Sequence, residues 1–200
     1  MSRDSVSVNE LLKSQYVSKS TLRRDLIKLE EKGLIIRTHG GIIPKRASAD
    51  DKIPFFLREN EQNSAKKIIA EKAVKYINDG DIIMLDGTTS AYYIVPLLTR
   101  FKDIIVITSG AKASFLLGEL GIKNISTGGE MITKSFSYVG TAAQSAISSY
   151  NANIAFFSCR GLSEDGLLSD NSAEENAVRK LMIKHAKKKI FLCMDLITCF

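Results

Sequence analysis

Apolar and polar residues follow two different patterns along the chain. Within residues 1–47 the apolar side chains recur at helical spacing, and Leu22, Leu26 and Leu29 at positions i, i+4 and i+7 predict one amphipathic helix. Beyond residue 80, short continuous apolar runs such as residues 82–85 alternate with amphipathic stretches. That alternation is typical of a mainly parallel sheet covered by helices. The chain is therefore expected to contain two dissimilar parts.

The helix in the first part is predicted over residues 18–33. The Ser18 hydroxyl can accept a hydrogen bond from an amide of the first turn, and Gly33 tolerates the positive φ that commonly follows a helix. Upstream, Ser7 and Glu10 have the spacing of a capping box and open a shorter amphipathic helix, which meets the second one near Tyr16. The polar side of the second helix is basic, with Lys19, Arg23, Arg24 and Lys28.

A short hairpin is predicted over residues 34–41. Two helices joined by a tight turn and followed by a hairpin are the parts of a winged helix-turn-helix, whose second helix enters the major groove. The positive charge by itself has an alternative explanation, which is a solvated basic helix that has no nucleic acid partner. Residues 1–48 contain 10 Lys and Arg against 5 Asp and Glu, whereas residues 49–200 contain 18 against 17. The basic excess therefore lies on the predicted DNA-binding part.

The domain boundaries follow from composition. We expect a winged helix-turn-helix over residues 1–47, a linker with two prolines over 48–62, and an α/β domain over 63–200. Strands are expected at residues 82–85, 104–107, 122–125, 154–157 and 190–194. Helices are expected at residues 64–78, 91–98, 111–120, 141–148 and 172–187.

Four of the expected strands end in small polar or glycine-rich loops. Ligands of parallel sheets bind beyond the carboxyl ends of the strands, where glycines admit the ligand and hydroxyls or amides bind oxygen anions. Each loop alone is also an ordinary turn between a strand and a helix. Together they predict a pocket for a small phosphorylated molecule. The expected lining residues are Asp86, Gly87, Thr88, Thr89, Thr108, Ser109, Gly128, Gly129 and Gly161.

The order of these motifs resembles the DeoR family of bacterial transcriptional repressors. The resemblance is carried by VSVNELLKSQYVSKSTLRRDLIKLEEKGLIIRTHGG and by IIMLDGTTSAYYIVPLL, IIVITSG, STGGE and NIAFFSCRGLSEDGLLSD. It implies a winged helix-turn-helix and a sensor domain of the ribose-5-phosphate isomerase-like fold that binds sugar phosphates. Arg58 and Lys66 match the cations that the family carries before the first strand. The DNA-binding residues are expected to be Ser18, Lys19, Ser20, Thr21, Arg23, Arg24, Arg37 and His39.

Two departures from the family pattern lie near the ends of the chain. Only five residues precede Val6, where the family has a further helix, so we expect an incomplete, loosened helix-turn-helix. Near the other end Thr198 stands where the family has a Lys that is expected to face the phosphate. A neutral group there should weaken phosphate binding, in a sensor domain that we expect to be incomplete at its C-terminal side.

The favoured function is a repressor of sugar metabolism genes that leaves operator DNA when a sugar phosphate binds. The family resemblance also implies a homo-oligomer. One alternative is an enzyme of the sugar-phosphate isomerase kind, for which Asp86 and Glu174 are the candidate carboxylates, and Glu174 is also expected at the pocket. Another is a shortened chain that binds effector but not DNA. We expect no enzymatic activity.

Composition adds three further expectations. No run reaches the ~18 apolar residues of a membrane span, and the N-terminus lacks an apolar signal segment, so a cytoplasmic protein without a membrane partner is expected. Neither His39 nor His185 has a second ligand at metal-binding spacing, so no metal and no cofactor are expected. Cys159 and Cys193 sit in apolar runs and are expected to be buried free thiols in a reducing compartment.

Overall fold

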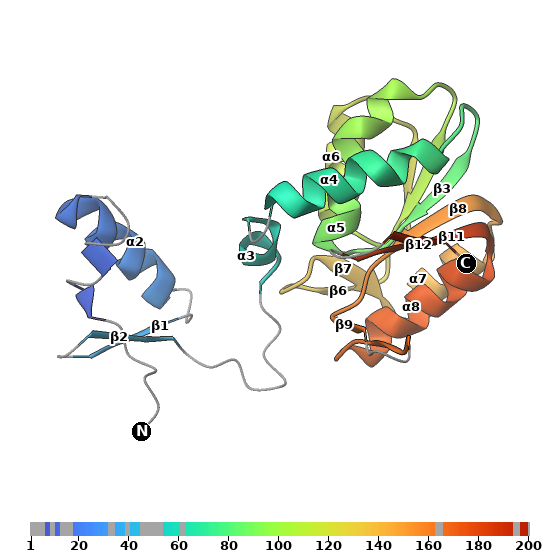
Figure 1. Ribbon diagram of the computed structural model, residues 1–200. Coiled ribbons are helices and arrows are strands. Elements are labelled where there is room, and N and C mark those ends of the chain that lie inside the picture. Colours follow the sequence, from blue (N-terminus) through green and yellow to red (C-terminus); the bar gives the residue numbers. More distant parts are fainter. Residues whose placement is uncertain are drawn as a thin grey trace. The chain divides into compact units, whose positions relative to one another are not determined.

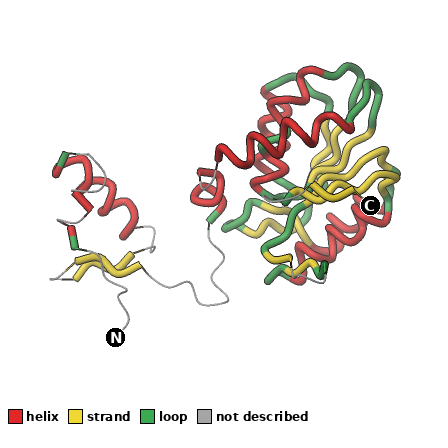
Figure 2. Tube along the Cα trace, viewed as in Figure 1, coloured by secondary structure: helices red, strands yellow, loops and turns green. Residues whose placement is uncertain are grey.

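The computed structural model describes residues 7–8, 11–12, 18–31, 35–38, 41–44, 54–60, 63–162, 166–193 and 197–199. The chain divides into a first unit, Met1–Asp51, and a second unit, Lys52–Phe200 (Figure 1). Helices and strands of both units are distinguished by colour in Figure 2.

The first unit contains helix α2, Lys19–Glu31, and an antiparallel hairpin of β1, Ile35–Thr38, and β2, Gly41–Pro44. The amide of Thr21 donates to Ser18 Oγ at 3.1 Å, so Ser18 caps the helix as predicted. Upstream, Val8, Leu11 and Leu12 are helical. The small core comprises Leu22, Leu26 and Ile42, packed against Val8, Leu11, Leu12, Leu29 and Ile35.

The predicted second helix and the presence of a hairpin are thus confirmed, but the hairpin extends to Pro44, beyond its expected end at residue 41. Glu10 of the predicted capping box, the turn at Tyr16, Gly33 and the segment before Val6 lie outside the described residues.

The second unit is built on a six-stranded sheet. The strand order is β12-β11-β8-β3-β4-β5, and all neighbouring pairs are parallel except the antiparallel β11 and β12. The strands are β3, Ile82–Leu85; β4, Ile105–Thr108; β5, Asn124–Ser126; β8, Ala152–Phe157; β11, Ala186–Leu192; and β12, Ile197–Cys199. The predicted α/β fold with a mainly parallel sheet is confirmed.

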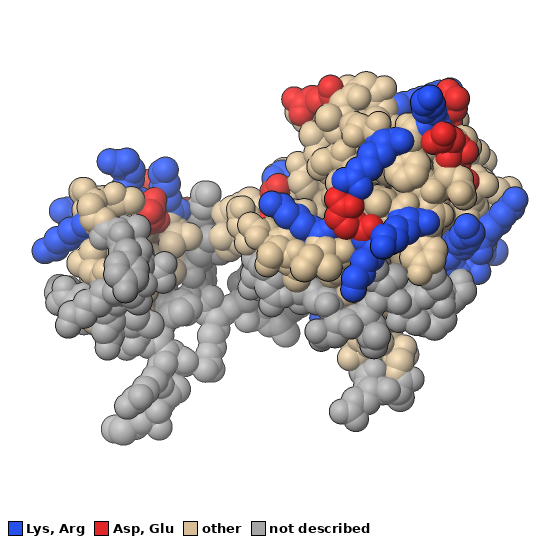
Figure 3. Space-filling model, turned by 45° about the horizontal axis from the view of Figure 1, so that its top comes forward, with Lys and Arg blue, Asp and Glu red and all other residues tan. Residues whose placement is uncertain are grey.

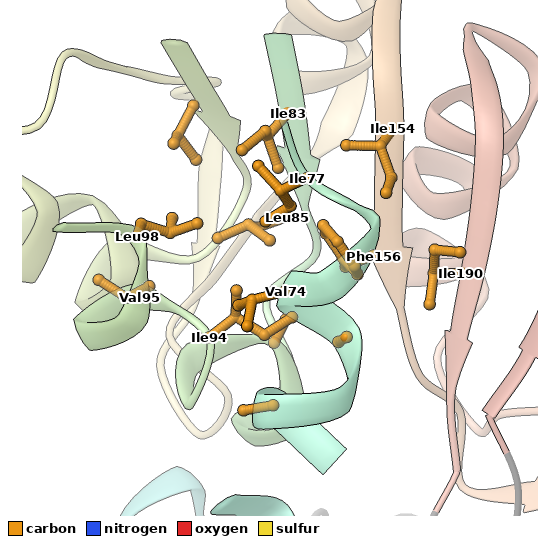
Figure 4. Packing of buried hydrophobic residues seen from close by; sticks show 14 of the residues in the cluster. Val74, Ile77, Ile83, Leu85, Ile94, Val95, Leu98, Ile154, Phe156 and Ile190 are labelled. Atoms are coloured by element: carbon orange, nitrogen blue, oxygen red, sulfur yellow. The ribbon is translucent and has the colours of Figure 1, made fainter. Parts of the chain in front are cut away.

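Helices cover both faces of this sheet because neighbouring strand residues point to opposite sides. Ile83 and Leu85 belong to one core cluster, and Met84 between them belongs to the other. Figure 4 shows the first cluster, where Val74, Ile94 and Leu98 lie near the strand residues. The helices on that face are α4, Asn63–Ala73; α5, Thr89–Tyr92; and α6, Ala111–Glu119, with the 3₁₀ turns Val74–Tyr76 and Val95–Arg100. On the other face lie α7, Gly140–Ser148, and α8, Ala173–Lys184.

Two small hairpins stand beside the main sheet, and neither was predicted. One pairs β6, Glu130–Ile132, with β7, Ser137–Val139, and the other pairs β9, Gly161–Leu162, with β10, Leu168–Ser169. Strands of two or three residues are too short to give a recognisable alternation of apolar and polar positions.

The prediction of a linker over residues 48–62 is wrong for residues 54–60. Phe55–Asn60 form helix α3, and the Phe55 side chain is buried at 2% exposure. Its ring contacts the edges of Tyr92 and Phe136, with centroids 5.6 and 6.2 Å away. This helix therefore exists because of packing within the second unit.

Three of the expected helices differ from the structure. The helix expected at 64–78 ends as α4 at Ala73 and continues only as the 3₁₀ turn Val74–Tyr76. The helix expected at 91–98 is split into α5 and a 3₁₀ turn, where Pro96 cannot donate a backbone hydrogen bond. Helix α8 ends at Lys184, because Ala186 already pairs with Ala152 of β8. Among the described residues, none of the helices has the length and apolar character needed to cross a membrane.

Candidate functional site

The sheet order creates a switch point between β3 and β8. The chain runs outward from β3 through β4 to β5, then returns to the opposite side of β3 to form β8 and β11. Ligands of open α/β sheets bind at the carboxyl ends of strands at such a point. A cavity of about 330 Å³ lies there, of a size that suits a small ligand. This switch-point cavity is lined by Arg58, Lys66, Gly87, Thr88, Thr89, Ser90, Ser135, Ser158, Cys159, Arg160, Gly161, Leu162, Asp170, Glu175, Phe191, Leu192 and Cys193.

Among the described residues, three cationic side chains line the switch-point cavity, each from a different segment. Arg58 comes from α3, Lys66 from α4 and Arg160 from the segment between β8 and β9. Lys66 is 7% exposed, and its Nζ donates to the carbonyl oxygen of Arg58. Burial lowers the pKa of Arg58, and the Glu175 carboxylate opposes that shift. Partly desolvated cations attract an anion more strongly than cations in bulk water do.

Asp86 fixes the loop that follows β3. One carboxylate oxygen accepts from the amide and the hydroxyl of Thr88 at 3.1 and 2.6 Å. The other accepts from the Ser158 amide at 3.0 Å and from Arg179 Nε at 3.2 Å. Asp86 is 3% exposed and does not line the switch-point cavity. It therefore shapes the cavity by joining the ends of β3 and β8, and its charge is met by internal donors.

Arg179 of α8 links Asp86 to a second carboxylate. Its Nη1 lies 3.3 Å from Asp170 Oδ2, and its side chain is 9% exposed. Burial by itself lowers the pKa of Arg179, but the carboxylates of Asp86 and Asp170 outweigh burial and raise it. The guanidinium therefore stays charged and holds α8 against the loops after β3 and β10.

Six of the residues predicted for the effector site line the switch-point cavity. They are Arg58, Lys66, Gly87, Thr88, Thr89 and Gly161. Ser109 lies beside Asp86 around a separate, smaller hollow.

Besides Asp86 and Ser109, four further predicted residues are not part of this lining. Thr108 ends β4, and Gly128 and Gly129 follow β5; both strands lie on the far side of β3 from the switch point. Glu174 is exposed, whereas its neighbour Glu175 lines the cavity.

Several lining residues were missed by the sequence analysis. Glu175 is one helical turn before Arg179, so a polar pair at positions i and i+4 was the available signal. Asp170 and Ser135 lie in or beside the two hairpins that the apolar pattern did not reveal.

The basic residues of α2 form the second candidate site. Lys19, Arg23 and Arg24 are exposed, as are the hydroxyl-bearing Ser20 and Thr21. In Figure 3 the blue side chains of the first unit belong to this helix. Ser18 Oγ is within 2.9 and 2.8 Å of the Ser20 and Thr21 hydroxyls, so it has a capping role. Arg37 lies in β1, with nothing described of its side chain, and His39 lies outside the described residues.

The described residues contain no group of three or more His, Cys, Asp or Glu side chains that could hold a metal ion. Cys159 and Cys193 are free thiols as predicted, but they are half-buried and not buried, because they lie in the wall of the switch-point cavity.

The fold and the exposed basic helix define a DNA-binding transcription regulator with an attached α/β sensor domain. The DeoR-like helix-turn-helix domain matches residues 1–45, and the DeoR C terminal sensor domain matches residues 61–195. The chain belongs to the DeoR family.

Named relatives agree with this assignment. The chain is 35% identical over 191 residues to the HTH-type transcriptional regulator YulB of Bacillus subtilis, covering 95% of this chain and 73% of the relative. It is 30% identical over 190 residues to the L-fucose operon activator of Haemophilus influenzae, covering 94% and 75%. It is 31% identical over 194 residues to the HTH-type transcriptional repressor CsqR of Escherichia coli, covering 96% and 73%.

Solved structures show likeness of fold alone. A tetrameric eIF2B-beta2-delta2 complex from C. thermophilum gives a TM-score of 0.50 at 19% identity, over 69% of this chain and 42% of that chain. A D-ribose-5-phosphate isomerase in complex with phospho-erythronic acid gives 0.49 at 18% identity, over 64% and 51%. This chain therefore spans about half the length of these proteins or less.

Proposed function

We propose that the chain is a transcriptional repressor of sugar metabolism genes, which a phosphorylated sugar releases from operator DNA. The proposal that the chain binds a phosphorylated sugar rests on the switch-point cavity. A sugar phosphate presents an anionic group and several hydroxyls. Arg58, Lys66 and Arg160 supply cations for the phosphate, and Asp170 and Glu175 supply acceptors for hydroxyls.

The proposal that the chain binds operator DNA rests on the exposed surface of α2. Ser20, Thr21, Arg23 and Arg24 are proposed to reach base edges in the major groove, and Lys19 to hold a backbone phosphate. Arg37 and His39 of the hairpin are proposed as further phosphate contacts. Because one relative is named an activator and another a repressor, repression by this chain is part of the proposal.

The release of DNA requires that effector and DNA favour different arrangements of the protein. Helix-turn-helix regulators read paired half-sites as dimers, so we propose a homo-oligomer in which the sugar phosphate changes how the protomers are arranged. A ligand of equal affinity for both arrangements would leave DNA binding unchanged.

We further propose that the cavity binds the sugar phosphate without converting it. An isomerase needs a base within hydrogen-bond reach of the substrate. The two carboxylates predicted for this role do not meet the requirement, because Asp86 is saturated by internal donors and does not line the cavity, and Glu174 is exposed outside it. Of the carboxylates that do line it, Asp170 is paired with Arg179, and Glu175 is proposed to bind a sugar hydroxyl. Turnover of ribose 5-phosphate by the purified chain would contradict this proposal.

Fluorescence anisotropy of the full chain on labelled duplexes, selected from a random library, tests both halves. Binding is expected to weaken steeply with salt and to be reversed by one member of a panel of ribose, fructose and glucose phosphates, but not by the free sugars. Arg24→Ala is expected to weaken DNA binding at least tenfold. Arg100→Ala, an exposed change in the second unit, is the control. Unchanged binding by Arg24→Ala would refute the assignment of the recognition helix.

A further inference from the structure

One buried hydroxyl in the wall of the switch-point cavity has no hydrogen-bond partner in the part of the chain that the structure describes. Ser135 is 2% exposed, and its Oγ is without a hydrogen-bond partner among the described residues. Other buried hydroxyls nearby are paired: Ser158 Oγ donates to the Leu192 carbonyl at 2.8 Å, and Ser137 Oγ donates to the Gly87 carbonyl at 3.5 Å. A buried hydroxyl without a partner destabilises a fold unless something else satisfies it.

We propose that Ser135 is an effector-contacting residue whose hydroxyl donates a hydrogen bond to a phosphate oxygen of the bound sugar phosphate. The inference rests on the proposed function, because it needs an anionic ligand in the cavity. Ser135 lines the same cavity as the cations Arg58 and Lys66, so a phosphate that meets them lies in the same space. Hydrogen bonds to an ionised acceptor are about twice as strong as neutral ones, which favours a phosphate oxygen over a sugar hydroxyl.

The backbone holds this hydroxyl in place. Ser135 belongs to the turn between β6 and β7, and its amide donates to the Ile132 carbonyl at 3.1 Å. The preceding Lys134 carbonyl accepts from the Phe55 amide at 2.8 Å, and the following Phe136 ring packs against Phe55. The turn is therefore fastened on both sides of Ser135 to the first residue of α3.

Because of the same contacts, a phosphate bound at Ser135 should affect the docking of α3 as well as the affinity for the ligand. Arg58 is three residues after Phe55 on α3 and lines the cavity together with Ser135. A phosphate bound by both side chains joins the turn to α3 through the ligand as well as through the protein. Binding at Ser135 therefore stabilises the docking of the helix through which the chain enters the second unit.

A matched pair of serine variants tests the proposal. Ser135→Ala and Ser137→Ala remove hydroxyls two residues apart, both from buried side chains, at 2% and 3% exposure. Calorimetric titrations of the full chain would use the panel of sugar phosphates and inorganic phosphate as probes. The parent and Ser137→Ala are expected to bind the preferred probe within about twofold of each other, whereas Ser135→Ala binds it at least ~10-fold more weakly.

Thermal unfolding without any probe gives a second, independent readout. Ser135→Ala is expected to unfold at the parent's temperature or above it, because it loses an unsatisfied group. Ser137→Ala is expected to unfold at a lower temperature, because it loses its bond to Gly87. Ser135→Cys keeps most of the volume and a weak donor, so its affinity should fall between those of the parent and Ser135→Ala.

The outcomes separate this inference from the function on which it rests. If Ser135→Ala binds the probe as tightly as the parent, or unfolds at a clearly lower temperature, the role of Ser135 is refuted and the sensor function stands. If no sugar phosphate and no inorganic phosphate binds the parent, both are refuted.

Discussion

Replacing Arg179 by Met tests whether one guanidinium holds the ligand end of the sheet together. Arg179 Nε lies 3.2 Å from Asp86 Oδ2, and Nη1 lies 3.3 Å from Asp170 Oδ2. The three side chains are 9, 4 and 8% exposed. Met retains apolar contact area with the neighbours of Arg179 but leaves two carboxylates buried without their cation.

The expected loss of stability depends on which hydrogen-bond donors each carboxylate retains. Breaking a buried ion pair by removing one partner typically destabilises a protein by about 3–5 kcal/mol. Asp86 keeps the donors from Thr88 and Ser158, and Asp170 keeps the Asn171 amide at 2.7 Å, so we expect ~3–4 kcal/mol. Adding Asp170→Asn to the variant removes one buried carboxylate charge that has lost its cation. This second change should restore ~1 kcal/mol or more of the free energy of unfolding.

Urea unfolding followed by tyrosine fluorescence measures this cost. Tyr16 lies in the first unit and the other five of the six tyrosines lie in the second, so the signal reports the second unit. With a slope of about 2 kcal/mol per molar urea, the midpoint should fall by roughly 1.5–2 M. Arg100→Met breaks an exposed pair with Glu71 and should shift it far less. Equal small shifts in the two variants would refute the argument that Arg179 is essential.

Three further changes probe other parts of the second unit. Phe55→Ala should destabilise it by ~3–5 kcal/mol in the same urea assay, because a fully buried ring is lost; a loss below ~1 kcal/mol would show that α3 is not anchored there. Gly129→Ala places a Cβ 2.4 Å from the Val139 carbonyl at φ +104°, and should cost at least ~2 kcal/mol. Gly80→Ala, at φ +79° with nothing within 4 Å, should cost only about 1 kcal/mol, and equal costs would contradict the steric argument. Burial raises the pKa of the Cys159 thiol above its ordinary value of 9.0, so this group contributes stability below pH 9 that is lost as the pH rises through the folded-state pKa. Iodoacetamide should therefore alkylate Cys159 with a pH midpoint above 9.0, and a midpoint below 9.0 would contradict burial as the dominant cause.

Local patterns were sufficient to predict most elements. The apolar run at residues 82–85 predicted β3 because a strand buried on both faces needs apolar residues on both. Ser18 predicted the start of α2 because capping depends on residues within one turn. Helix α3 was missed because six residues are too few for helical periodicity, and its stability comes from Tyr92 and Phe136, which are distant in sequence.

For a related reason, only some of the residues that line the cavity could be predicted from the sequence. Loops after four strands have similar compositions, but only strand order decides which of them meet. Gly87 and Gly161 follow the adjacent strands β3 and β8, whereas Thr108 ends β4 and Gly129 follows β5 on the other side. No short stretch of sequence specifies that order. The unpaired Ser135 hydroxyl likewise becomes visible only when every neighbouring donor and acceptor has been accounted for.

The docking of α3 also determines how many residues connect the first unit to the second. While Phe55 stays in its pocket, residues 54–60 belong to the second unit and add nothing to the chain that separates the two. Released, these seven residues would behave as a flexible segment with a root-mean-square length of roughly 13–16 Å. A longer tether lowers the effective concentration of the recognition helix at a DNA site once a neighbouring site is occupied. In the proposed homo-oligomer, this one aromatic anchor would therefore determine how strongly tethering contributes to avidity for DNA.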